Sequence, residues 1–160
     1  MFGFLSSRRN RAAPETALEA LDRGDYAAAE PLLTRAIEGA EHPREQAFYF
    51  NKRGVARIEL NRRDEARTDF VSALQCVQRY APALTNVGNL LLEEDRVDDA
   101  VAYYCRAIEA DGEYAAAYVN LATAYKRAGR FDEAVRALRT GLRLAGRARG
   151  RKRVRPREDR

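Results

Sequence analysis

Hydrophobic and polar positions repeat along this chain with an offset of 34 residues. Large side chains show the offset first, at Phe50, Leu84 and Tyr118. The same offset relates Ala66, Ala100 and Ala134; Phe70, Tyr104 and Leu138; Ala73, Ala107 and Gly141; and Leu74, Ile108 and Leu142. Self-similarity at one fixed offset is typical of a repeat architecture, in which each copy is one supersecondary unit.

A fourth, poorer copy precedes these three at an offset of 37 residues. Ala29, Leu33, Ala36 and Ile37 take the places of Ala66, Phe70, Ala73 and Leu74. The extra residues fall near 41–45, where we expect a loop to absorb them.

Each copy reads as two amphipathic helices joined by a short turn. The turns are expected at residues 23–25, 61–63, 94–96 and 128–130. Gly24 and Gly129 suit the left-handed conformation that often ends a helix. Asn61 can adopt this conformation at some cost, and Asp95 adopts it less easily. Acidic residues follow the turns and complement the dipole of the second helix, at Asp64, Glu65, Asp98, Asp99, Asp132 and Glu133.

Small residues stand where two helices are expected to approach closely. Gly54, Gly88 and Ala122 lie on the first helices, and large residues such as Phe70 and Tyr104 fill the space beside them. A single helix pair cannot bury its apolar face, so the copies are expected to share one continuous core.

This pattern resembles the tetratricopeptide repeat (TPR) family over residues 12–146. The resemblance implies an all-α, right-handed α-solenoid of about four helix-turn-helix TPR units, roughly eight helices. Arg57 departs from the family pattern, because it stands where Leu91 and Tyr125 hold a large side chain in later copies. We expect its stem to pack and its charged head to reach water, with Asp69 as a plausible partner. The first helix of copy one is expected to be short, starting near Pro14.

Charge divides the chain into three segments. Residues 1–11 and the arginine-rich residues 147–160 are basic, whereas residues 12–146 are mildly acidic. The predicted organisation is a flexible N-terminus (1–11), a TPR array (12–146, with copies near 12–43, 47–80, 81–114 and 115–146) and a disordered tail (147–160).

No constellation of catalytic residues is present in the sequence. His42 is the only histidine and stands beside Pro43 in an expected loop, and the sequence has no glycine-rich phosphate loop, HExxH or GxSxG. The two cysteines, Cys76 and Cys105, form no CxxC pair and favour free thiols in a reducing cytosol. We therefore predict a cytoplasmic protein that is no enzyme and holds no cofactor or metal, and no apolar run is long enough to span a membrane.

The family resemblance implies a concave groove lined by the first helix of each copy, which binds a peptide or a partner protein. The groove positions that it implies are Phe48, Asn51, Val55, Glu59, Thr85, Asn86, Asn89, Leu92, Glu93, Val119, Asn120, Thr123 and Arg127. Asparagine amides carry both donors and an acceptor for a peptide backbone, or they bind neighbouring groups and water instead.

Family members that hold the C-terminal carboxylate of chaperones use a clamp of lysine, arginine and asparagine. The matching positions here are Asn51, Val55, Asn86, Ala116 and Asn120. Because none is cationic, we predict that the chain does not bind chaperone tails in this way.

Two further surfaces remain open as alternatives. A basic tail is expected to contact phosphates of nucleic acid, anionic lipid or an acidic protein, or to act only as a solubilising segment. Its basic residues are Arg147, Arg149, Arg151, Lys152, Arg153, Arg155 and Arg157. Leu138, Leu142 and Leu144 leave an open edge on the last helix. This edge is expected to stay partly exposed, to pack on a second copy as a homo-oligomer, or to pack on a partner.

Overall fold

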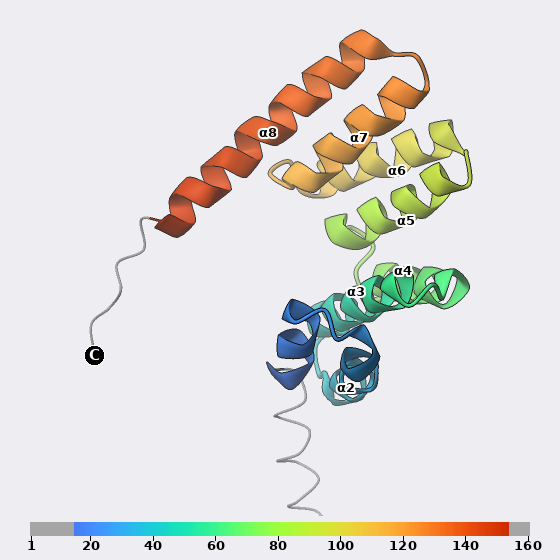
Figure 1. Ribbon diagram of the computed structural model, residues 1–160, viewed down its shortest axis with the longest axis vertical. Coiled ribbons are helices and arrows are strands. Elements are labelled where there is room, and N and C mark those ends of the chain that lie inside the picture. Colours follow the sequence, from blue (N-terminus) through green and yellow to red (C-terminus); the bar gives the residue numbers. More distant parts are fainter. Residues whose placement is uncertain (1–14, 154–160) are drawn as a thin grey trace, which may run out of the picture. The chain divides into compact units, whose positions relative to one another are not determined.

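A computed structural model of the protein describes residues 15–153, which consist of helices and turns without a strand (Figure 1). Within the described residues, positions 15–22 are helical, and seven further helices follow. They are α2 (Tyr26–Gly39), α3 (Pro43–Glu59), α4 (Arg63–Cys76), α5 (Ala81–Glu93), α6 (Val97–Ala110), α7 (Ala115–Arg127) and α8 (Phe131–Arg153). The all-α class and the helix-turn-helix order are confirmed.

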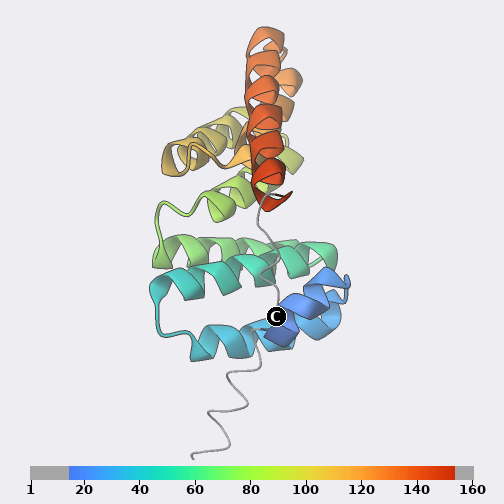
Figure 2. The same ribbon diagram turned by 90° about the vertical axis from the view of Figure 1, so that its left-hand side faces the viewer.

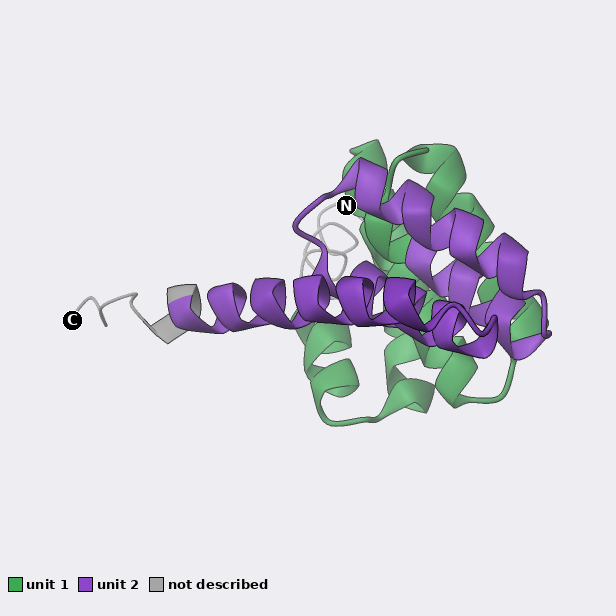
Figure 3. Ribbon diagram, turned by 90° about the horizontal axis from the view of Figure 1, so that it is seen from above, with its two compact units in different colours: residues 1–83 green, residues 84–160 purple. Residues whose placement is uncertain are grey.

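The helices form two compact units, residues 1–83 and 84–160, which Figure 3 distinguishes by colour. In the first unit, α3 packs against both α2 and α4 (Figure 2). Its core contains the fully buried Leu33 and Ala29 from α2, with Ala56 from α3. Phe70 of α4 lies against Gly54 of α3, where an added Cβ would come 2.5 Å from the ring.

The second unit repeats the same contact one copy later. A Cβ added to Gly88 on α5 would come 2.6 Å from the ring of Tyr104 on α6, and Tyr104 is fully buried. Next, α6 packs against α7, and α7 packs against α8. The predicted pairing of small and large positions between helices is therefore confirmed in both units.

All four predicted turns place one residue in the left-handed region. The φ angles are 74° at Gly24 and Gly129, 60° at Asn61 and 63° at Asp95. The two non-glycine residues pay a conformational cost, which we attribute to the short loop between two helices that must pack side by side.

Arg57 differs from its expected role. Its side chain is only 14% exposed, and its Nη1 lies 2.9 Å from Asp69 Oδ2. It also contacts Glu30 and Glu65. The pairing with Asp69 is confirmed, but the head does not reach freely into water, because three carboxylates surround it. The sequence also gave no sign that Arg53 shares Asp69, with Arg53 Nη2 2.7 Å from Asp69 Oδ1.

The boundary expected at residue 147 is wrong, because α8 continues to Arg153. Arginine, alanine and lysine favour helix, and the residues between 147 and 153 include no proline, so nothing stops the helix there. Residues 1–14 and 154–160 lie outside the described part of the chain, including the expected flexible N-terminus, Arg155 and Arg157. Among the described helices, none is both long and apolar enough to cross a membrane.

Candidate functional site

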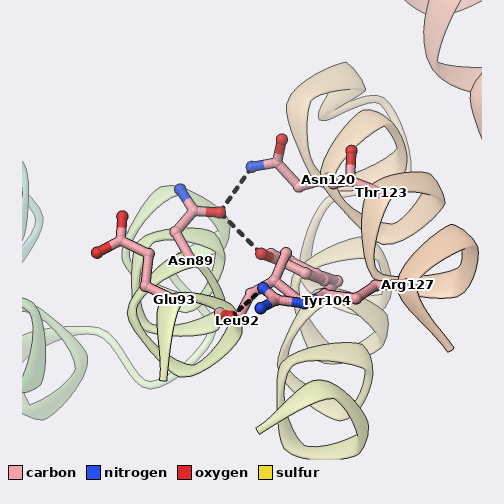
Figure 4. A pocket seen from close by; sticks show the side chains of 7 residues that line it. All are labelled: Asn89, Leu92, Glu93, Tyr104, Asn120, Thr123 and Arg127. Carbon is pink, nitrogen blue, oxygen red and sulfur yellow. Dashed lines mark hydrogen bonds between the residues drawn. The ribbon is translucent and has the colours of Figure 1, made fainter. Parts of the chain in front are cut away.

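A hollow of about 250 Å³ lies among α5, α6 and α7 in the second unit. Its lining residues are Asn89, Leu92, Glu93, Tyr104, Asn120, Thr123 and Arg127, and we name it the α5–α7 groove (Figure 4). The structure thus brings together six of the predicted groove residues, and Tyr104 is an addition.

The Asn89 side chain lies at the centre of a hydrogen-bond network. Its Oδ1 accepts from the Tyr104 hydroxyl at 2.9 Å and from Asn120 Nδ2 at 2.8 Å (Figure 4). Asn89 Nδ2 is 3.5 Å from Asn86 Oδ1, the upper limit for a hydrogen bond. Because both lone pairs of Asn89 Oδ1 are used, the orientation of this amide is fixed. The expectation that asparagines bind neighbouring groups therefore holds for Asn89.

Arg127 joins the end of α5 to α7. Its Nη1 donates to the Leu92 carbonyl at 2.7 Å, and its Nη2 lies 3.0 Å from Asp95 Oδ1. The Leu92 carbonyl belongs to the last turn of α5, where backbone acceptors lack partners within the helix. Arg127 therefore acts as a link between helices as well as a wall of the groove.

Sequence reasoning assigned Tyr104 to the core and missed its hydroxyl. The ring packs against Gly88, while the hydroxyl reaches the groove. Burial, assisted by the negative charge of Glu93, raises the pKa of Tyr104 to about 12. A buried tyrosine hydroxyl needs a hydrogen-bond partner. The asparagines of α5, the first helix of the same repeat, were the sequence feature that could have indicated this partner.

The remaining predicted groove residues differ in accessibility. Asn51 and Thr85 are buried, with 6% and 3% exposure, so a partner cannot reach them in this structure. Phe48 is half-buried and has Lys52 Nζ 5.4 Å from its ring centroid. Val55 and Asn86 are half-buried and Glu59 is exposed. Val119 lies instead in a second hollow, between α7 and α8, which Thr123 also lines.

The basic tail residues are only partly described. Arg147 and Arg149 are exposed on α8, and Arg151, Lys152 and Arg153 belong to its last turn. Their contact with an anionic partner stays a prediction.

Residues 15–153 contain no group of three histidine, cysteine or carboxylate side chains placed to hold a metal ion. Cys76 and Cys105 are both free thiols, as predicted. Burial raises the pKa of the Cys105 thiol, against the opposing effect of a hydrogen bond with Tyr125. A raised pKa disfavours the reactive thiolate, which agrees with packing rather than chemistry at this position.

Solved structures with the same fold include three informative cases. MamA is 19% identical to this chain, with a TM-score of 0.69. The matched region covers 88% of this chain and 81% of the MamA chain. PilF of Pseudomonas aeruginosa shares 22% identity with a TM-score of 0.72, covering 87% of this chain, which spans 62% of the PilF chain. The second TPR of Spaghetti (RPAP3), bound to an HSP90 peptide, shares 23% identity with a TM-score of 0.58, covering 63% and 94% of the two chains. These likenesses show the fold.

Sequence comparison defines the family more directly. No curated protein gives a significant match to the chain. In contrast, the tetratricopeptide repeat family matches residues 15–83, 51–115 and 91–151, which together span nearly all of the described helices. The 34-residue offset, the small residues between paired helices and these matches agree, and the chain belongs to the tetratricopeptide repeat family.

Proposed function

We propose that this protein is an interaction scaffold that binds an extended peptide segment of a partner protein in the α5–α7 groove. The observation that supports this most is the convergence of Asn89, Asn120 and Thr123 on one hollow. A scaffold of this kind needs no catalytic group, since its effect is to hold a partner.

The amides of Asn89 and Asn120 suit a peptide group. Asn120 Nδ2 is engaged by Asn89, and its Oδ1 lies on the opposite side of the amide from that bond (Figure 4). Asn89 Nδ2 has only the long contact with Asn86. An acceptor on one helix and a donor on the other complement the N–H and C=O groups of an extended backbone.

Charge in the groove favours a segment without a carboxylate at this point. Glu93 lines the groove, and the positive charge of Arg127 is already paired with Asp95. A carboxylate placed here would meet Glu93 and would gain little from Arg127. A neutral or basic side chain of the partner would meet no such repulsion.

Peptide binding by a neighbour in fold supports the class of partner. The second TPR of Spaghetti was solved with an HSP90 peptide bound, which shows that this fold can hold a linear segment.

A selection and mutation experiment tests the proposal. Peptides selected from a random display library on the full chain would be measured by fluorescence anisotropy against the wild type, Asn89→Ala and Asn120→Ala. Each variant removes an amide of the groove, so we expect Kd to rise by about tenfold, on the order of 1–1.5 kcal/mol for one hydrogen bond.

The matched control is Gln75→Ala, which removes an exposed amide of α4 in the other unit. It should leave Kd unchanged. Circular dichroism must show that Asn89→Ala remains folded, because this change also removes the partner of the Tyr104 hydroxyl. Equal Kd values in all folded variants would refute the groove. Binding that is lost instead in Arg147→Gln with Arg149→Gln would favour the alternative, an accessory protein that contacts anionic nucleic acid through its basic segment.

A further inference from the structure

Equivalent positions in the last two repeats differ sharply in exposure. Tyr104 on α6 is fully buried, whereas its counterpart Leu138 on α8 is 42% exposed. Val97, Val101 and Ile108 on α6 are half-buried, and their counterparts on α8 are exposed. Those counterparts are Phe131, Val135 and Leu142, exposed by 64%, 57% and 60%. They form the apolar stripe of α8.

The helix that covers this face in the preceding repeat is α7, which packs against α6. Its inner residues are small or aliphatic, with Ala117, Leu121 and Ala124 buried at helical spacing. Cys105 on α6 shares a hydrogen bond with Tyr125 on α7. The packing of α7 on α6 therefore indicates which side chains fit against the equivalent face of α8.

The described chain does not supply such a helix for α8. After α6 the chain turns at residues 111–114 and returns as α7. At the equivalent point α8 runs straight on to Arg153, and it is the long helix that Figure 1 shows beside α7. Residues 145–153 thus continue α8 at the point where α6 gives way to a turn.

The uncovered face is concave. A hollow of about 250 Å³ lies between the two helices, with Val119, Ala122 and Lys126 from α7 and Phe131, Val135 and Leu138 from α8. A hollow beside an apolar stripe is suited to a rod-shaped element with projecting side chains. A flat membrane surface would touch the stripe and leave the hollow unfilled.

Charge indicates the chemistry of the occupant. Arg139 is exposed on α8 at the position equivalent to Cys105, which contacts Tyr125 of the covering helix. Lys126 lines the other side of the hollow. At the junction of α2 with α3, a charge pair joins two helices packed in this way, with Arg57 Nε 3.0 Å from Glu30 Oε1, although Glu30 corresponds to Val135 and not to Arg139. An acidic side chain on the occupant would complement Arg139 in the same manner.

We infer that the α7–α8 face binds an acidic amphipathic helix of a partner protein, packed as α7 packs on α6. Its inner positions carry small and aliphatic residues like those of α7, and a carboxylate stands opposite Arg139. This face shares Thr123 with the lining of the α5–α7 groove, but the inference does not depend on the function proposed for that groove.

The probe is a fluorescein-labelled, side-chain-stapled peptide with the sequence of residues 115–127 and the changes Tyr125→Glu and Lys126→Glu. Stapling is needed because so short a helix is marginal in water. In anisotropy titrations with the full chain, we expect saturable binding that weakens by about tenfold or more in Leu138→Asp, since a charge would be buried against apolar residues. We expect a similar loss in Arg139→Glu.

A charge swap distinguishes specific docking of the peptide from nonspecific binding to an apolar surface. Arg139→Glu should regain affinity for the same peptide made with Tyr125→Lys in place of Tyr125→Glu. The control Arg35→Glu, an exposed arginine of α2, should bind both peptides as the wild type does.

Three results would overturn the inference. One is equal binding of the acidic peptide by the wild type, Leu138→Asp and Arg139→Glu. A second is the absence of peptide binding together with sedimentation of the protein on vesicles of phosphatidylserine and phosphatidylcholine, which would assign the face to a membrane. The third is absent peptide binding together with a dimer, seen by light scattering, that Leu138→Asp abolishes, which would assign it to a second copy.

Discussion

Asp69 on α4 accepts a charge-assisted hydrogen bond from Arg53 on α3, with Arg53 Nη2 2.7 Å from Asp69 Oδ1. The Asp69 side chain is 1% exposed, and Arg53 is 14% exposed. A carboxylate buried to this degree is tolerated only when it is paired. This pair ties the two helices of one repeat together at the centre of the first unit.

We predict that Asp69→Ala destabilises the protein strongly. The change leaves Arg53 and Arg57 enclosed without this carboxylate, so the free energy of unfolding should fall by about 3 kcal/mol. Urea unfolding followed by circular dichroism measures it. Asp64→Ala, which removes an exposed carboxylate at the start of the same helix, should cost less than about 1 kcal/mol. An unchanged unfolding midpoint in Asp69→Ala would show that the pair contributes nothing.

Gly88→Ala should also destabilise the protein. The added Cβ would lie 2.6 Å from the Tyr104 ring, so the two helices must move apart, at a cost of about 1–3 kcal/mol. Gly146→Ala is the matched control on α8, where an added Cβ meets nothing within 4 Å. It should raise stability by about 0.5–1 kcal/mol through helix propensity. Thermal unfolding gives the midpoint temperature of both variants, and equal midpoints would argue against close packing at Gly88.

Alkaline pH should weaken the fold through Tyr104. Its pKa is raised to about 12 from 10.0, so between these pH values the unfolded state loses a proton that the folded state keeps. The unfolded state then binds fewer protons, and the free energy of unfolding falls as pH rises from about 10 to about 12.

Tyr104→Phe lacks this proton, so its stability should fall less steeply over the same pH window. Urea unfolding at intervals between pH 9 and about pH 12 measures the slope. Tyr118→Phe removes an exposed hydroxyl and should keep the slope of the wild type. Identical slopes for Tyr104→Phe and the wild type would disprove the assignment.

An acidic C-terminal chaperone peptide should not bind at micromolar concentration. Asn51 is buried, and none of the positions that match the carboxylate clamp carries a cation. Asn120 donates to Asn89, and a carboxylate in the α5–α7 groove would meet Glu93. Calorimetry with such a peptide checks the prediction, and a micromolar Kd would contradict it. The same peptide with an amidated C-terminus serves as the control for the carboxylate.

The periodicity of the sequence by itself determined the helical repeat. Helix positions, the left-handed turn residues at Asn61 and Asp95 and the contact of Gly88 with Tyr104 all follow from local rules of helix geometry and small-residue packing. Such rules act over one repeat of the chain, so a single sequence records them.

Only the tertiary structure decided which polar groups share a partner. Arg53 reaches Asp69, and Tyr104 reaches Asn89, because two helices place side chains from different turns within hydrogen-bond distance. The burial of Tyr104 and the exposure of its counterpart Leu138 are likewise decided by what packs beside each helix. Pairing and burial depend on three-dimensional neighbours, and the order of residues along one chain does not specify them.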